Sequence, residues 1–156
     1  MNCLRAETLL QDIDKAIKDI RSFEYASALE KSYLAKFLVV FICGLYEEII
    51  ETIISEKVEK LRCHQVSNFV TKYLEDYFRN PCFDKVIELL GKFDSAWAED
   101  LGKIQKILRS ALDSIVSNKN AIAHGLNCDI TLDQVEEFYY NSRKVIEKID
   151  EVVLSD

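Results

Sequence analysis

The polar side chains that could do chemistry gather in residues 112–125, LDSIVSNKNAIAHG. Because an α-helix advances about 100° per residue, one narrow sector of a helix here would hold Asp113, Ser117, Asn120 and His124, with Lys106 upstream on the same stripe. An imidazole exchanges protons near neutral pH, and an ammonium group stabilises developing negative charge. The stripe therefore predicts a polar helix face that contacts either water or another molecule.

Lys119 lies five residues before His124, which separates the two side chains by about 140° around an ideal helix. The two are therefore not neighbours within one helix. A second copy of the helix, related by two-fold symmetry, would bring the Lys of one chain toward the His of the other. In a simpler alternative, His124 only complements the helix dipole, and Lys119 and Asn120 are ordinary surface residues.

The elements that position this stripe are predicted to be helices, because four glycines and one proline in 156 residues supply too few turns for a barrel or sandwich. Apolar residues at steps of three and four predict helices over residues 6–22, 27–63, 66–80, 84–91 and 95–125, and a last helix capped by Thr131. We expect an all-α bundle of four principal helices with one or two short extra helices, forming a single domain over residues 1–156.

The middle of the second predicted helix, FLVVFICGLY, is apolar on every side, which is typical of a helix enclosed by others. Gly44 within it predicts the close approach of a neighbouring backbone. This apolar run has ten residues, about half of what a bilayer requires. We therefore expect a core helix and no membrane contact.

Net charge and cysteine usage restrict the class of protein further. A net charge of −7 argues against a surface that grips nucleic acid at many phosphates, so a nucleic-acid site must be local. The five cysteines are widely spaced, without a CxxC pair or a Cys and His cluster at metal-ligand spacing. These features predict reduced thiols, a cytoplasmic protein and no metal site.

The stretch Lys119-Asn120-Ala121-Ile122-Ala123-His124-Gly125 resembles the RNxIAHG signature of the RiboL-PSP branch of the HEPN superfamily, with Lys119 in place of the family's Arg. The following TLDQVEEFYYNSRKVIEKID and the apolar segment that ends in Leu45-Tyr46-Glu47 are similar to this branch as well. The resemblance implies a helical bundle that forms a homodimer and cleaves RNA without a metal or other cofactor.

In the activity that the resemblance implies, two motifs form one composite site from His124, Lys119 and Asn120. The imidazole would activate the ribose 2′-hydroxyl, which attacks the adjacent phosphorus and leaves a 2′,3′-cyclic phosphate and a 5′-hydroxyl. The cation would hold the phosphate oxygens, and Asn120 would orient the phosphate or the His. Lys supplies charge without the planar two-pronged hydrogen bonding of Arg, so we expect weakened or lost catalysis.

Four residues are candidates for supporting this site: Ser117, Asp113, Glu47 and Lys106. Ser117 and Asp113 would contact substrate or pair across the dimer, or else be solvated. The resemblance places Glu47 where the family often carries an acid that would steer the catalytic His or Lys. With Glu48 and Glu51 beside it, ordinary surface charge is the alternative.

Other candidates have simple structural interpretations. The basic trio Lys103, Lys106 and Arg109 is a local positive patch, or it only balances neighbouring acids. The aromatic row Phe138-Tyr139-Tyr140 would stack bases, or it places one ring in the core and the others at an interface. Cys63 and His64 are adjacent, and their side chains would point about 100° apart on a helix, so we do not expect them to act together.

Three functions are consistent with these features. The first is a homodimeric endoribonuclease that acts as a toxin or antiviral effector and is controlled by an antitoxin or other regulatory protein, a setting that comes from the resemblance alone. The second is an attenuated or inactive module that binds RNA or a partner protein. The third is a helical adaptor in which His124 has no function.

Overall fold

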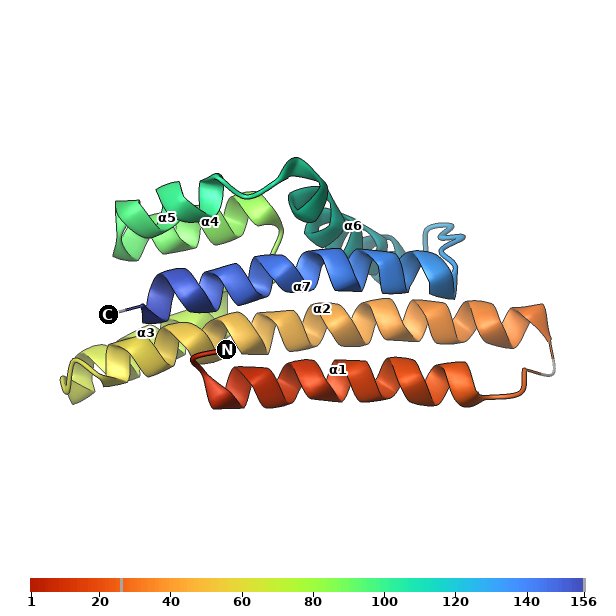
Figure 1. Ribbon diagram of the computed structural model, residues 1–156, viewed down its shortest axis with the longest axis horizontal. Helices are drawn as coiled ribbons and strands as arrows, with labels where there is room; N and C mark the ends of the chain where they lie inside the picture. Colours follow the sequence, from red (N-terminus) through yellow and green to blue (C-terminus); the bar gives the residue numbers. More distant parts are fainter. Residues whose placement is uncertain (26, 156) are drawn as a thin grey trace.

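The computed structural model describes residues 1–25 and 27–155, which form helices joined by short loops and contain no strand (Figure 1). In chain order the helices are α1 (Leu4–Ser22), α2 (Ala28–Glu59), α3 (His64–Tyr77), α4 (Phe83–Phe93), α5 (Ser95–Gly102), α6 (Lys106–Ala123) and α7 (Leu132–Leu154). The predicted all-α bundle is confirmed. Its long helices are α1, α2, α6 and α7, and the described residues form three shorter helices rather than one or two.

Helix α2 is the central element of the bundle, since it packs against α1, α3, α6 and α7. Figure 1 shows α1, α2 and α7 side by side, with α6 beside α7 and the shorter helices toward one end. The predicted apolar stripe of α1, made of Leu10, Ile13, Ile17 and Ile20, is buried in this core. Within the part of the chain that the structure describes, no helix is long and apolar enough to cross a membrane.

Polar contacts in the core fasten α1 and α2 to α7. The buried hydroxyl of Tyr46 lies 2.8 Å from the Ser142 hydroxyl, and the Tyr139 hydroxyl donates to Asp14 at 2.8 Å. The buried carboxylate of Asp150 accepts the backbone N–H of Cys3 at 2.9 Å. Because buried polar groups are costly unless they are hydrogen-bonded, these contacts specify how the three helices pair.

The prediction of one helix over residues 95–125 is wrong, because the chain breaks into α5 and α6 around residues 103–105. The Arg109 side chain lies over this break. It donates from Nε to the Ile104 carbonyl at 2.9 Å and from Nη2 to the Gly102 carbonyl. The same guanidinium lies 4.8 Å from the centre of the Phe83 ring. Arg109 thus satisfies carbonyls that the end of α5 leaves without helical partners.

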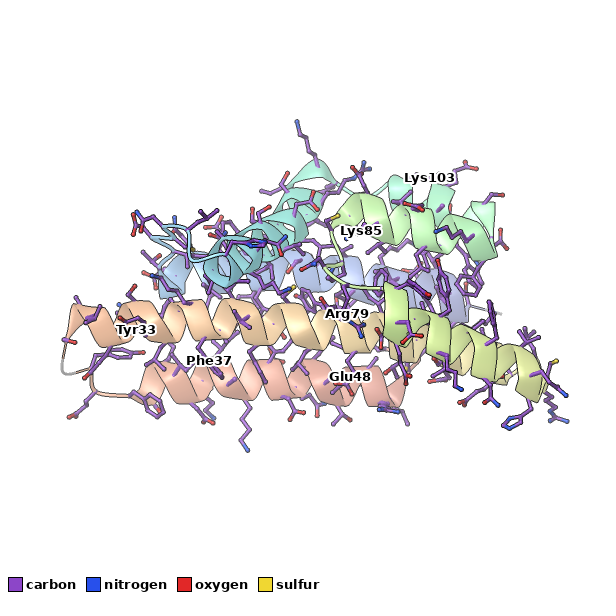
Figure 2. All side chains as sticks on the ribbon, turned by 180° about the vertical axis from the view of Figure 1, so that it is seen from behind. Tyr33, Phe37, Glu48, Arg79, Lys85 and Lys103 are labelled. Atoms are coloured by element: carbon purple, nitrogen blue, oxygen red, sulfur yellow. The ribbon has the colours of Figure 1, made fainter. Side chains whose placement is uncertain are left out.

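The prediction that the middle of α2 is enclosed on every side is also wrong. Residues four, four, three and four apart lie on one side of a helix, and on α2 such a row is exposed: Leu29, Tyr33, Phe37, Val40 and Gly44. Among the described residues, no atom outside the adjacent turns of α2 lies within 4 Å of where a Cβ at Gly44 would be, so no other element's backbone approaches it. We call this row the open α2 face, and Figure 2 shows Tyr33 and Phe37 on it.

Candidate functional site

The C-terminal end of α6 presents the candidate catalytic His. The helix ends because Gly125 adopts a φ of 66°, a left-handed conformation that glycine takes without steric cost. The Leu126 N–H then donates to the Ala121 carbonyl at 2.9 Å and the Gly125 N–H to Ile122 at 3.1 Å, which is the Schellman pattern. His124 therefore caps the helix with an exposed ring that makes no hydrogen bond or ion pair to the described residues.

Lys119 is held by a residue that the sequence did not single out. Its ammonium group donates to the side-chain oxygen of Asn80 at 2.7 Å, in a half-buried position. Among the described residues Lys119 makes no ion pair, so its charge is not neutralised by a carboxylate. An ammonium group has three N–H donors, so two donors stay available to an anion while Asn80 holds the third.

Asn80 also connects Lys119 to Glu47 on α2. The Asn80 backbone N–H donates to the Glu47 carboxylate at 2.7 Å, and Asn80 adopts a left-handed φ of 56°, which Asn tolerates better than most residues. The α3–α4 loop thereby bridges α2 and α6. The structure brings Glu47 and Lys119 to one place, with Asn80 between them.

Arg79 and Glu51 flank this bridge. The Arg79 guanidinium lies 3.1 Å from the Glu51 carboxylate, and burial raises the pKa of Glu51 despite the opposing effect of Arg79. Cys43 is buried on the same side of α2, and burial together with the charge of Glu47 raises its pKa to about 11, against a lowering effect of Lys119. Because a thiolate rather than a thiol is the nucleophile, Cys43 is inert at neutral pH.

The remaining predicted site residues on α6 differ in whether their side chains already have a hydrogen-bond partner. Asp113 is tied into the fold, since its carboxylate accepts the backbone N–H of Phe83 at 2.8 Å, at the first turn of α4. Ser117 and Lys106 are exposed, and Asn120 is half-buried. These three side chains make no hydrogen bond to the described residues, so they are available to a ligand, whereas Asp113 already has a structural role.

The other sequence candidates have structural roles or no partner in the site. Lys103 pairs with Asp100 at 2.7 Å and with Glu99 at 3.5 Å. Arg109 donates to backbone carbonyls at the break between α5 and α6, so the basic trio is not a free positive patch. Of the α7 aromatic row, Tyr139 is in the core and Tyr140 is exposed. His64 contacts Asn68, and Cys63 is exposed.

The described residues contain no group of three or more His, Cys, Asp and Glu side chains that could hold a metal ion. The candidate site instead consists of an exposed imidazole, an unpaired ammonium group held by Asn80, and the adjoining open α2 face. The apolar side chains of this face have no cover among the described residues.

Comparison with known proteins yields one family match. The sequence model of the family described as RiboL-PSP-HEPN matches residues 2–155 of the chain. No match was found among curated proteins, and none among solved structures. The match covers all seven helices of the described residues and includes both Glu47 and His124.

Proposed function

The chain belongs to the RiboL-PSP-HEPN family, and from this premise we propose that it is a homodimeric endoribonuclease whose composite site uses His124, Lys119 and Asn120. Membership of a HEPN family supports a role connected with RNA. The finer proposal rests on one observation: among the described residues, the exposed imidazole of His124 has no partner, the ammonium group of Lys119 has no counter-ion, and nothing covers the apolar face beside them.

The open α2 face supports the proposed homodimer. Exposed apolar patches of this kind mark interaction surfaces, and Tyr33, Phe37 and Val40 are 61%, 55% and 41% exposed. Because α6 packs against α2, a two-fold contact over this face would bring two α6 helices near the symmetry axis. The His124 and Lys119 side chains of the two copies would then converge on one phosphate, which one chain alone does not achieve.

In the proposed reaction, His124 removes the proton of a ribose 2′-hydroxyl as the oxygen attacks the adjacent phosphorus. The P–O5′ bond breaks, the 5′-oxygen takes up a proton, and the products are a 2′,3′-cyclic phosphate and a 5′-hydroxyl. Lys119 stabilises the negative charge on the phosphate oxygens. Asn120 orients the phosphate or the imidazole, and Glu47 acts as a positioning residue because Asn80 connects it to Lys119.

Supporting contacts are proposed for Ser117 and Lys106, which are exposed on α6. Asp113 is proposed to support the site indirectly, because its bond to Phe83 fixes the start of α4 and so the end of the α3–α4 loop. In a biological setting drawn from the family resemblance, the protein is a cytoplasmic toxin or antiviral effector with an antitoxin or other regulatory partner.

A second function has its own supporting observation. Glu47 and Glu51 on α2 contact Asn80 and Arg79, the residues beside Lys119, and Lys119 lacks the two-pronged geometry of the family's Arg. Both features oppose a strong phosphate site. The alternative is therefore an attenuated or inactive module that binds RNA or a partner protein.

Cleavage of mixed-sequence RNA by the purified protein separates the two functions. We expect cleavage that survives EDTA and yields 2′,3′-cyclic phosphate ends, and a loss of about 10²-fold or more in His124→Ala. The matched controls are His64→Ala and Lys18→Met, which change an exposed His on α3 and an exposed Lys on α1. Unchanged activity in His124→Ala would remove this residue from the mechanism, and inhibition by EDTA would refute the metal-independent scheme.

The variant Lys119→Arg tests the alternative. If the native protein binds RNA without turnover and Lys119→Arg gains cleavage, the native site is attenuated and the second function holds. If the native protein cleaves efficiently and Lys119→Met loses this activity, the Lys is a working substitute for Arg and the inactive module is rejected.

A further inference from the structure

Helix α3 exposes a row of aromatic rings outside the proposed catalytic site. The rings of Phe69, Tyr73 and Tyr77 recur every fourth residue, with centroids 6.3 Å and 5.2 Å apart. Phe69 is 70% exposed and Tyr77 is 73% exposed, whereas the core side of α3 is supplied by Val70 and Leu74. We call these three rings the α3 aromatic row.

A small cleft of about 160 Å³ lies between this row and α4. Its apolar wall is made by Tyr73, Tyr77, Phe78 and Leu89, and its charged lining is Arg79, Lys85, Lys92 and Glu88. The cleft is thus bordered by three cations and one carboxylate in a chain with a net charge of −7. Its volume suits one planar ring rather than a folded protein element.

The cations of the cleft differ in what already occupies them. Lys92 pairs with Glu88 at 2.8 Å, and Arg79 pairs with Glu51 at 3.1 Å. The Lys85 ammonium donates to the Arg79 carbonyl at 3.0 Å and makes no ion pair among the described residues. Lys85 is therefore the cation in this cleft that is free to bind an anionic group.

We propose that the cleft between α3 and α4 binds single-stranded RNA, with bases stacked on the α3 aromatic row and a phosphate on Lys85. Stacking of successive bases on aromatic rings beside a positive groove is the general mode of sequence-tolerant single-strand binding. Unpaired strands are favoured over duplexes because only unstacked bases can reach such rings. The inference rests on the proposed function in one respect, that the ligand is RNA.

The position of the cleft connects it to the site on α6. Arg79 lines the cleft, and the next residue, Asn80, holds the ammonium of Lys119 at 2.7 Å. Figure 2 shows Arg79 and Lys85 at the junction of α3 and α4, on the side of the molecule that carries Tyr33 and Phe37. A strand stacked on α3 thus continues past the α3–α4 loop toward Lys119 and lengthens the RNA segment that the protein holds.

Fluorescence anisotropy with a labelled 12-nucleotide oligouridylate tests the cleft in the 156-residue chain that carries His124→Ala, so that turnover does not interfere. We expect Tyr77→Ala to weaken binding about 5-fold to 100-fold, as loss of one stacked base does, and Tyr77→Phe to retain binding. Lys85→Met should lower the slope of log affinity against log salt by about 0.7. Phe23→Ala and Lys18→Met, an exposed ring and an exposed Lys at α1, should leave binding unchanged.

The outcomes separate this inference from the proposed catalytic function. Native-strength binding by a Tyr77→Ala, Lys85→Met double variant with unchanged circular dichroism would overturn the inference, as would the absence of any RNA binding. RNA cleavage that requires His124 but is identical in Tyr77→Ala also overturns it, while the proposed nuclease stands. Binding that is lost in Tyr77→Ala, in a protein that never cleaves RNA, supports the cleft and rejects the nuclease.

Discussion

Replacing Phe37 by alanine tests whether the open α2 face pairs two copies of the chain. A Phe side chain has about 150–250 Å² of surface to bury, and Phe37 is 55% exposed, which leaves roughly 100 Å² for a partner to cover. At about 25 cal/mol per Å², and allowing for the methyl group that alanine retains, this is about 2 kcal/mol for each copy. Two-fold symmetry counts the residue twice, so Phe37→Ala should weaken dimerisation by about 4 kcal/mol, roughly a thousandfold.

Sedimentation equilibrium over a range of protein concentrations measures this change directly. The matched control is Tyr140→Ala, because Tyr140 is 51% exposed on α7 rather than on the open α2 face. Where Phe37→Ala is monomeric it should also lose RNA cleavage, although its His124 and Lys119 are intact. A dimer of native strength in Phe37→Ala, or equal weakening by Tyr140→Ala, would refute the assignment of this face.

Three further predictions follow from individual contacts. Asn80→Gly keeps the left-handed backbone and removes the acceptor of Lys119, so it should lower kcat about 10-fold with little change in Tm, and an equal kcat would remove Asn80 from the site. Asp113→Ala should cost about 1 kcal/mol in urea unfolding because the Phe83 N–H loses its acceptor, and Asp113→Asn should restore most of it. Burial raises the pKa of Cys43 from 9.0 to about 11, so the folded state retains a proton that the unfolded state loses; unfolding free energy should fall as pH rises from 9 toward 11, and less steeply in Cys43→Ala.

Much of the fold could be predicted because its signals are local. The buried stripe of α1 follows from apolar spacing, and Gly125 and Thr131 end α6 and begin α7 through backbone geometry and side-chain capping. Thr131 forms a capping box with Gln134, a pattern that four consecutive residues determine. Such features need no information from distant parts of the chain.

Sequence patterns fail to predict the fold where contacts between distant residues decide it. Leu101, Ile104 and Leu108 continue a helical pattern across the break between α5 and α6, and the break is satisfied by the side chain of Arg109. The sequence of an apolar helix is the same whether its face is covered by another helix of the chain or left exposed. The exposure of Phe37 therefore could not be separated from burial by periodicity.

Sequence patterns predict the α6 part of the candidate site but not the contribution of Asn80. The motif around His124 lies on consecutive residues of one helix, so its spacing identifies it. Asn80 lies 39 residues before Lys119 and has no local pattern that connects it to a cation. The nearest signal was the Pro that follows it, because the position before proline ends helices and Asn is among the residues that tolerate a left-handed backbone.

The proposed shared site requires that two copies of the chain bring the ends of their α6 helices together. Crosslinking with a short bismaleimide tests it in a chain that carries His124→Cys with Cys63→Ser and Cys82→Ser, because the other native thiols are buried. We expect a covalent dimer from His124→Cys and little from Ile107→Cys, an exposed position about 25 Å away along α6. A dimer in solution that crosslinks through residue 107 and never through residue 124 would contradict the shared site.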